Sequence, residues 1–178
     1  MTFDRIFAMP NSHTFKMLPV KEILDWYCKP YLKIVDPFAR DSIYAAHYSN
    51  DLNPTFKTAY QMEATEFLDL MIVKQERFDI ALLDPPYSPR QISEAYQQIG
   101  RKVTGQDTQN ARLYKACKDR LTTLLKDNGI AISFGWNSGG FGITRGFELL
   151  HIRLIYHGAA HNDTIVTIEK KCFSQTTI

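Results

Sequence analysis

The sequence predicts an α/β domain built around a sheet, and two observations support this. Short runs rich in β-forming residues alternate with runs of helical periodicity along most of the 178 residues, the order that produces a sheet covered by helices. The most continuous apolar run, Phe78 to Leu83, stops at Asp84-Pro85-Pro86. Two prolines cannot continue a strand ladder, so a buried strand must give way there to a loop at the carboxyl edge of the sheet.

In chain order, the first expected strand is Lys33 to Val35, which ends at Asp36-Pro37. Two further strands are expected at Ile43 to Tyr48 and at Tyr60 to Met62. Ala64 to Val73 is expected to form a helix, because its apolar residues recur at helical spacing. Three candidate strands and one helix therefore precede the buried strand.

After the buried strand, Ser88 to Asp107 is expected to be a long flexible loop. A helix with an apolar stripe is expected from Thr108 to Lys126, and Asn128-Gly129 is expected to cap its C-terminus. The remaining strands are expected near the end of the chain: Ile130 to Phe134, and a closing hairpin of Leu149 to Tyr156 with Thr164 to Ile168.

The composition is that of one folded domain, which we expect to span residues 1–178. Hydrophobic residues make up 44% and charged residues 22% of the chain, enough apolar surface to argue against intrinsic disorder. No apolar run approaches the roughly 20 residues that cross a bilayer. Asp4 and Arg5 interrupt the region where a secretory signal would be apolar. We therefore expect a cytoplasmic chain without a membrane partner.

Cysteine and histidine spacing predicts no metal site. Cys28, Cys117 and Cys172 lie far apart and form no CxxC pair, so a zinc ribbon or a thioredoxin-type site is not expected. Their odd number suits reduced thiols that act as small core side chains. His157 and His161 have the spacing of helical zinc ligands, but they lie in an expected turn between two strands and lack the HExxH glutamate.

Charge is unevenly distributed along the chain. The whole sequence carries +2, from 21 basic and 19 acidic residues, whereas Ser88 to Asp127 holds an excess of four positive charges. A local basic segment can contact phosphates while the whole protein stays near neutral. A solvated helix face explains the same pattern equally well, so both interpretations stay open.

The segment Asp84-Pro85-Pro86-Tyr87 carries the most specific chemistry. Asp84 and the Pro85 carbonyl are two acceptors held by rigid rings, and Tyr87 adds an aromatic face at the sheet edge where such folds bind ligands. Two acceptors can draw an exocyclic amino nitrogen toward tetrahedral geometry and localise its lone pair for attack on a methyl donor. A base in a duplex must flip out to reach such a pocket, and stacking on the tyrosine offsets part of that cost. A strand-ending turn is the simpler interpretation.

With three other segments, this motif resembles the amino-methyltransferases that methylate adenine N6 or cytosine N4 with S-adenosylmethionine. Asp84-Pro85-Pro86-Tyr87 matches the family's catalytic (D/N/S)PP(Y/F/W) motif, and Asp36-Pro37-Phe38-Ala39 matches the opening of its cofactor motif, DPFAGSG. Thr14-Phe15, ahead of Pro19-Val20, is similar to the segment that covers the methionine end of the cofactor. The resemblance extends from about Thr14 to Lys170.

The resemblance implies a Rossmann-like class I methyltransferase fold, with a mostly parallel seven-stranded sheet, helices on both faces and a C-terminal antiparallel hairpin. It also implies S-adenosylmethionine as cofactor, and Asp84, Pro85, Pro86 and Tyr87 as catalytic residues. The residues implied to bind the cofactor are Thr14, Phe15, Asp36, Phe38, Ala39, Asp51, Glu63 and Ala64. Among these, Asp51 would bind the ribose hydroxyls, and Glu63 with Ala64 would lie beside the adenine.

One segment departs from the family pattern. Where the family has a glycine-rich turn, this chain has Arg40-Asp41-Ser42. Glycine allows the backbone to approach the cofactor closely, so the turn must be built differently here. The stretch from Asp36 to Asp51 is also short for a complete crossover helix. A weak cofactor site, or a degenerate and inactive copy, is the alternative that this departure raises.

Three further residues are candidates for binding the substrate. Trp136 and Asn137 follow an expected strand and should lie beside the catalytic loop; a packed aromatic turn is the alternative interpretation. Arg90 follows directly from the catalytic motif and is a candidate phosphate contact, or else a solvated arginine.

The resulting hypothesis is an adenine-specific DNA methyltransferase that transfers a methyl group to N6. Aspartate is more usual in the adenine branch of the family, which is the only ground for preferring adenine. The alternatives are the same chemistry on RNA adenine or on cytosine N4 of DNA, and a non-catalytic cofactor-binding or partner subunit. The partner is expected to be nucleic acid, DNA rather than RNA. Because no stretch is free to form a target-recognition domain, we also expect a homodimer or a separate targeting partner.

Overall fold

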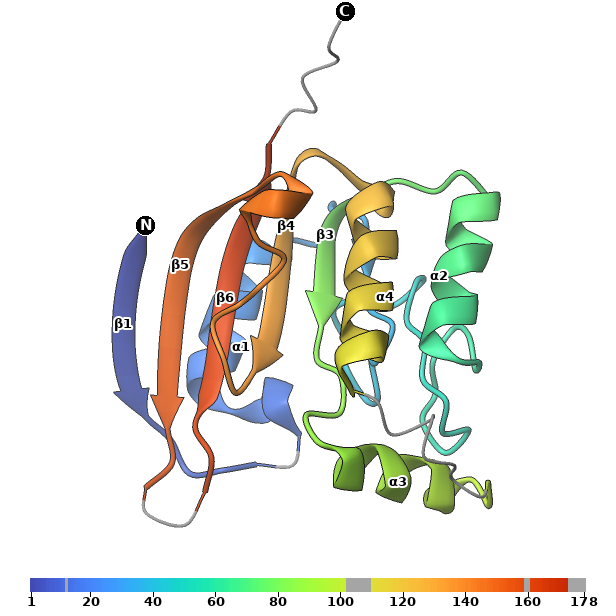
Figure 1. Cartoon of the computed structure of the whole chain (residues 1–178), viewed down its shortest axis with the longest axis horizontal. Helices are drawn as coiled ribbons and strands as arrows, with labels where there is room; N and C mark the ends of the chain where they lie inside the picture. The colour runs from blue at the N-terminus through green and yellow to red at the C-terminus, as the bar shows by residue number, and fades with distance from the viewer. Residues whose placement is uncertain (12, 102–109, 159–160, 173–178) are drawn as a thin grey trace, which may run out of the picture.

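The computed structural model describes residues 1–11, 13–101, 110–158 and 161–172 (Figure 1). Within them the strands form one six-stranded sheet in the order β1-β5-β6-β4-β3-β2. The strands are β1 (Thr2–Phe7), β2 (Ile34–Val35), β3 (Phe78–Leu83), β4 (Leu125–Gly135), β5 (Phe147–Tyr156) and β6 (Thr164–Lys171). The helices are α1 (Leu18–Tyr27), α2 (Ala64–Val73), α3 (Pro89–Gln98) and α4 (Asn110–Leu124), with 3-10 turns η1 (Thr14–Lys16) and η2 (Ile143–Arg145). None of the helices in these ranges is long and apolar enough to cross a membrane.

The sheet is mixed, and its antiparallel part is the expected C-terminal hairpin. β5 and β6 pair antiparallel, and β6 also pairs antiparallel with β4. The pairs β2–β3, β3–β4 and β1–β5 are parallel. The predicted hairpin and the predicted strands at β2, β3 and β4 are therefore confirmed.

The expected number of seven strands is too high for the described residues, and the discrepancy lies beyond β2. Residues 43–48 form turns, and the adjoining sheet continues only as two single parallel bridges, Asp36 with Ser49 and Asn50 with Tyr60. Side chains hold this segment instead of a ladder, because Ala45 is buried and the Tyr44 hydroxyl donates to Asp25 on α1 at 2.8 Å. The strand expected at Ile43 to Tyr48 is therefore wrong, and of the strand expected at Tyr60 to Met62 only Tyr60 forms a bridge.

Helices cover both faces of the central strands. Figure 1 shows α1 on one face and α2 with α4 on the other. β3 alternates between the two layers, since Ile80 and Leu82 pack with the α1 layer, whereas Ala81 and Leu83 pack with the α2–α4 layer. A strand buried on both faces reads as a continuous apolar run, which is why this strand was predicted with its observed bounds.

α3 replaces part of the loop expected from Ser88 to Asp107. Ser88 is its N-cap, with the side-chain oxygen accepting from the Gln91 N–H at 3.2 Å, and Pro89 occupies the first helical position. Both are standard helix-start signals, but the helix is mostly polar and buries only Ile92, so its composition is typical of a loop. The rest of the expected loop, from residue 102, lies outside the described residues.

Two further expectations at the sheet were wrong. Asn128-Gly129 does not cap a helix: α4 ends at Leu124 and β4 begins at the next residue, with Asn128 at φ 63° inside an irregular start of the strand. β1 was not predicted at all, because Asp4 and Arg5 interrupt its apolar pattern and its pairing partner β5 lies far along the chain. The start of the predicted helix at Thr108 lies outside the described residues.

Candidate functional site

The predicted site residues gather at the carboxyl edge of the sheet. Asp36 follows β2, Asp84 follows β3 and Trp136 follows β4. Because these three strands are parallel, their carboxyl ends meet at one edge, where open α/β sheets bind ligands. The η1 turn with Thr14 reaches the same edge, since its side chain hydrogen-bonds Asp84. α3 lies just beyond the end of β3 (Figure 1).

A cavity of about 250 Å³ opens at this edge and brings separate predicted segments together. Its lining includes five of the residues predicted for the cofactor or for catalysis: Thr14, Phe15, Phe38, Ala39 and Asp84. They come from η1, from the loop after β2 and from the end of β3. Only the tertiary fold makes these segments neighbours.

Asp36 is the most unusual carboxyl group at this edge. It is fully buried, and its Oδ1 accepts from the Phe38 N–H at 3.0 Å. Its Oδ2 has no hydrogen-bond partner among the described residues. Burial, together with the charges of Asp84 and Asp51, raises the pKa of this carboxyl well above its usual value. A buried polar atom without a partner is costly, so a ligand that donates to Oδ2 would be stabilised here.

The turn that departs from the family pattern is built with acidic side chains instead of glycine. Arg40 takes the left-handed conformation, φ 48°, that glycine would occupy without strain. Its N–H donates to Asp51 Oδ2 at 3.1 Å. The neighbouring Asp41 is anchored to η1 by an ion pair with Lys16 and a 3.0 Å contact with His13, and the Lys16 hydrogen bond in particular lowers the Asp41 pKa to about 2.

Asn50 was not singled out from the sequence, yet it connects the segments around the cavity. Its Nδ2 donates to the carbonyl oxygens of Pro37, at 3.1 Å, and Met62, at 3.0 Å. Its Oδ1 accepts from the Met62 N–H at 3.1 Å. A fully buried asparagine thus ties the loop after β2 to the start of α2. Only its place between two polar residues marked it in the sequence.

Asp51 and Glu63, the two acids predicted for the nucleoside half of the cofactor, already have protein partners. Asp51 Oδ1 accepts from the Asn53 N–H at 2.8 Å, and burial raises the Asp51 pKa despite its backbone hydrogen bonds. Glu63 accepts from the Tyr96 hydroxyl of α3 at 3.0 Å and pairs with Arg101. Carboxylate oxygens keep further acceptor capacity, so both acids can still receive a ligand. Ala64 is buried at the start of α2.

The predicted catalytic motif, residues 84–87, forms a hydrogen-bonded unit. The Tyr87 hydroxyl donates to Asp84 Oδ1, and the Tyr87 N–H donates to Gln91 Oε1 at 2.5 Å. Burial raises the Asp84 pKa, whereas hydrogen bonds from Tyr87 and Thr14 act in the opposite direction. Burial and the Asp84 charge raise the Tyr87 pKa well above its usual value, so the phenol remains a donor. Pro85 is buried and Pro86 half-buried.

Tyr114 of α4 belongs to the same environment, although the sequence analysis placed it only in a helix. Burial and the charge of Asp84 raise its pKa, so its hydroxyl lies within the electrostatic influence of the Asp84 carboxyl group. The proximity of Tyr114 to Asp84 could not be predicted from the sequence, because an aromatic side chain within a helix usually indicates the core.

The three residues predicted to bind substrate have different surroundings. The Trp136 ring lies 5.8 Å from the Tyr87 ring and is 43% exposed. Asn137 uses its side chain locally, because Oδ1 accepts from the Gly139 N–H at 3.0 Å. Arg90 is exposed on α3 and pairs with Glu94 at 2.7 Å. Of these three residues, Trp136 is the one whose side chain packs against the predicted catalytic motif.

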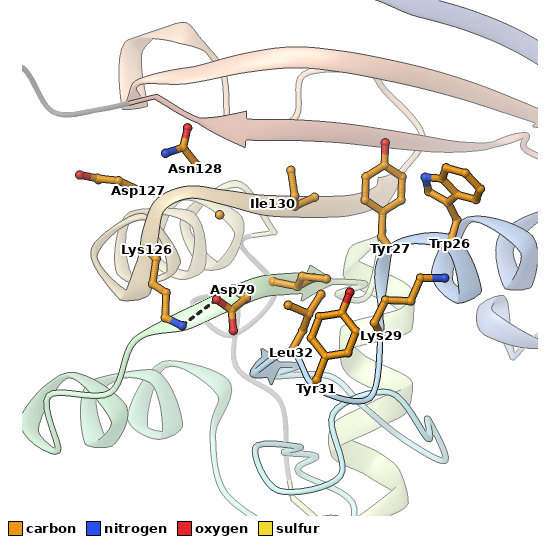
Figure 2. A pocket seen from close by; sticks show the side chains of 12 residues that line it. Trp26, Tyr27, Lys29, Tyr31, Leu32, Asp79, Lys126, Asp127, Asn128 and Ile130 are labelled. Atoms are coloured by element: carbon orange, nitrogen blue, oxygen red, sulfur yellow. Dashed lines mark hydrogen bonds and ion pairs between the residues drawn. The ribbon is translucent and has the colours of Figure 1, made fainter.

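A larger cavity, about 570 Å³, lies at the opposite, amino edge of the sheet (Figure 2). Lys126 and Asp79 form an ion pair at 2.6 Å on one side, and Trp26 and Tyr31 stand on the other. None of the predicted site residues lines it. Metal ligands do not gather at either edge: the described ranges contain no cluster of three His, Cys, Asp or Glu side chains.

The sequence matches no protein-family model and no curated protein sequence. Solved structures share the fold at low identity. TrmN from Thermus thermophilus superposes with a TM-score of 0.56 and 15% identity, over 87% of this chain and 49% of that one. NSun6 from Pyrococcus horikoshii, crystallised with SFG, gives 0.54 and 15%, over 81% of this chain and 49% of that one. This chain thus spans about half the length of those two proteins.

A third similar structure covers more of its own length. The 1,6-didemethyltoxoflavin-N1-methyltransferase from Burkholderia thailandensis, with its bound substrate and S-adenosylhomocysteine, gives a TM-score of 0.55 and 13% identity, over 88% of this chain and 78% of that one. These similarities confirm the predicted Rossmann-like α/β fold of methyltransferase structures, with six strands in the described residues in place of seven.

Proposed function

We propose that the chain is an S-adenosylmethionine-dependent methyltransferase that acts on the exocyclic amino group of a nucleobase, with N6 of adenine in DNA as the first candidate. One observation carries the proposal: a cavity at the carboxyl edge joins Thr14, Phe38 and Asp84, residues of three separately predicted segments. The shared fold agrees with it, because solved structures of this fold include methyltransferases, one of them with bound S-adenosylhomocysteine.

Residues in and around the carboxyl-edge cavity suit the proposed cofactor, although Asp36, Asp51 and Glu63 do not line the cavity itself. Asp36 Oδ2 lacks a donor among the described residues, and S-adenosylmethionine carries an ammonium group that can supply one. Phe15, Phe38 and Ala39 provide apolar lining, while Asp51 and Glu63 offer acceptors for the nucleoside half. When bound, S-adenosylmethionine would supply an activated methyl group beside Asp84.

The catalytic unit is suited to hold a planar base. The Asp84 carboxylate and the Pro85 carbonyl would accept the two N–H groups of the amino nitrogen. Burial raises the Asp84 pKa, whereas the hydrogen bonds from Tyr87 and Thr14 act in the opposite direction and favour the ionised form that accepts. The Tyr87 ring, backed by Trp136 at 5.8 Å, offers the stacking surface for a flipped base. The proton lost from nitrogen would pass to Asp84 or to solvent.

The deciding experiment compares matched DNA and RNA oligonucleotides that contain adenine or cytosine. The chain is incubated with labelled S-adenosylmethionine, and the methylated base is identified by mass spectrometry. N6-methyladenine in DNA supports the first candidate. N6-methyladenine in RNA, or N4-methylcytosine, keeps the chemistry and changes the substrate; no transfer to any of them contradicts the proposed activity.

A non-catalytic subunit is the second candidate, favoured by two features of the nucleoside half. Arg40 stands in the left-handed position of a glycine, and Glu63 is engaged by Tyr96 and Arg101. Isothermal titration with S-adenosylmethionine separates the candidates. Absence of binding at high micromolar concentration would favour the non-catalytic subunit.

If the chain is an enzyme, a homodimer or a separate targeting partner would provide its sequence selectivity.

A further inference from the structure

The loop after β4 is held by two side chains from other elements, the buried Glu169 and the partly buried Lys118. Glu169 on β6 is 3% exposed, and its two carboxylate oxygens accept from the Phe141 N–H at 2.5 Å and from the Gly142 N–H at 2.8 Å. Lys118 on α4 donates from Nζ to the carbonyl oxygen of Gly140. Three consecutive residues of the loop are therefore fixed from two sides.

Gly140 shows how closely the loop is pressed against Glu169. It has φ +39°, and a Cβ at this position would lie 2.2 Å from Glu169 Oε2 and 2.5 Å from Cδ. Such distances do not occur in proteins, so only glycine can stand here while the carboxylate keeps its place. The carboxylate and the loop backbone thus define one another's positions.

Burying a carboxylate costs free energy, because the charge loses its hydration. Replacing buried charged groups by apolar ones is often neutral or stabilising, so a stability role does not by itself account for Glu169. Its hydrogen bonds instead select one loop conformation, since they satisfy two specific backbone N–H groups. The Asn137 to Gly139 turn, at 3.0 Å, leads directly from this clamped region back to Trp136.

We propose that Glu169 is a positioning residue: it fixes residues 140–142 and thereby holds Trp136 beside Tyr87, as part of the aromatic wall that receives the target base. The idea that Trp136 receives the target base rests on the proposed function, whereas the idea that Glu169 holds Trp136 beside Tyr87 does not. Lys118 assists by holding the Gly140 carbonyl, and its ammonium also lies 5.8 Å from the centre of the Tyr114 ring. The clamp therefore joins β6, α4 and the loop around the catalytic motif.

The test uses Trp136 as its own reporter, in a Trp26→Phe background that removes the other tryptophan. Glu169→Gln preserves the shape of the side chain but turns an N–H₂ toward a backbone N–H donor. Acrylamide quenching of Trp136 should rise about twofold, because the side chain, 43% exposed in the folded protein, becomes more fully accessible when the loop is released. Affinity for S-adenosylmethionine should stay within about twofold of wild type, while KM for the nucleic acid rises about tenfold.

Matched variants separate the clamp from general damage. Gly140→Ala should reproduce the quenching change, whereas Gly146→Ala should not, because Gly146 also has positive φ, +79°, but meets no atom within 4 Å. Thr167→Val removes a different buried polar group from β6 and should leave Trp136 quenching unchanged. If Glu169→Gln does not fold, Lys118→Met weakens the same clamp from α4 and should change quenching in the same direction.

The outcomes distinguish the clamp from the proposed function. Unchanged Trp136 quenching in folded Glu169→Gln, or in Lys118→Met if that is the folded variant, overturns the proposal. So does an equal loss of cofactor affinity, which would indicate a fold-wide effect. If the wild type binds no S-adenosylmethionine but Glu169→Gln still releases Trp136, the proposed function fails and the positioning role stands.

Discussion

Two carboxyl groups, Asp36 at the carboxyl edge of the sheet and Asp79 at the amino edge, have pKa values shifted in opposite directions. At the carboxyl edge, Asp36 is fully buried with a partnerless Oδ2, and burial raises its pKa well above the usual value. At the amino edge, burial also acts on Asp79, but hydrogen bonds from Lys126 and from the Lys33 N–H outweigh it and lower the pKa. The amino edge has the larger cavity, about 570 Å³ against about 250 Å³.

The volume of a cavity therefore does not indicate which chemistry its side chains can perform. Asp79, one of the acids that line the amino-edge cavity, is already paired with Lys126, so a ligand would have to break this ion pair to bind Asp79 (Figure 2). At the carboxyl edge the fold instead buries the Asp36 carboxyl group with one of its two oxygens unpartnered among the described residues. Perturbed titratable groups of this kind mark functional sites more often than structural ones.

The largest expected difference between the edges is in catalysis. Asp84→Ala should reduce methyl transfer by about 10³-fold or more, because it removes an acceptor aimed at the reacting nitrogen. Binding of S-adenosylmethionine should remain measurable. Asp79→Asn, the matched change at the amino edge, should leave the rate unchanged. Steady-state assays on the two variants make the comparison, and near-wild-type transfer by Asp84→Ala would sink the proposed mechanism.

Asp36→Asn should separate stability from binding. The folded pKa of Asp36 lies above the unfolded value of 3.8, so the folded chain holds a proton that the unfolded chain releases. The wild-type free energy of unfolding therefore falls as pH rises from about 4 through the folded pKa. Asp36→Asn should abolish that fall and gain about 1–3 kcal/mol at neutral pH, while weakening cofactor affinity about tenfold or more.

Urea unfolding at several pH values and cofactor titration measure the two effects of Asp36→Asn. The control, Asp79→Asn, should behave in the opposite way. Its lowered pKa means that the Asp79 carboxylate contributes stability above pH 3.8 and loses it as pH falls through the folded pKa. A less stable Asp36→Asn protein at neutral pH would contradict the idea that this carboxyl is held at a cost.

Strained backbone gives a smaller test. Arg40 at the carboxyl edge and Gln75, just after α2, both have positive φ, 48° and 55°. Gln75→Gly should raise the free energy of unfolding by about 1 kcal/mol. Arg40→Gly should gain less, because it also loses the stacking of its guanidinium 5.3 Å from the Phe56 ring. Thermal denaturation compares them, and cofactor affinity should change only in Arg40→Gly.

The smallest effect is expected for the ion pair at the amino edge. Lys126→Ala removes the partner of Asp79, but both side chains are partly exposed, so the stability change should be under about 1 kcal/mol. Methyl transfer should be unaffected. A clear loss of transfer in this variant would show that the amino edge contributes to the activity, and the contrast between the edges would then have to be abandoned.

The local sequence pattern was sufficient to predict an element where the pattern depends on neighbouring residues alone. Ala64–Val73 and Phe78–Leu83 were predicted with their observed bounds, because helical periodicity and a doubly buried apolar run depend on neighbouring residues alone. α3 had the signals of a helix start at Ser88 and Pro89, but it is mostly polar and buries only Ile92, so a loop was expected there. β1 failed for the converse reason, since its pairing with β5 is non-local.

The sequence by itself determined the alternating elements, the strand-ending Asp84-Pro85-Pro86 loop and the side chains available for chemistry. The tertiary structure alone decided which of them meet. Asn50 and Glu169 act through backbone groups of distant segments, and no spacing along the chain records such partners. Burial and partners decided the rest: Asp36 and Asp79 are the same residue type, but complete burial beside other acids raises the pKa of Asp36, whereas the hydrogen bonds to Lys126 and to the Lys33 N–H lower the pKa of the less buried Asp79.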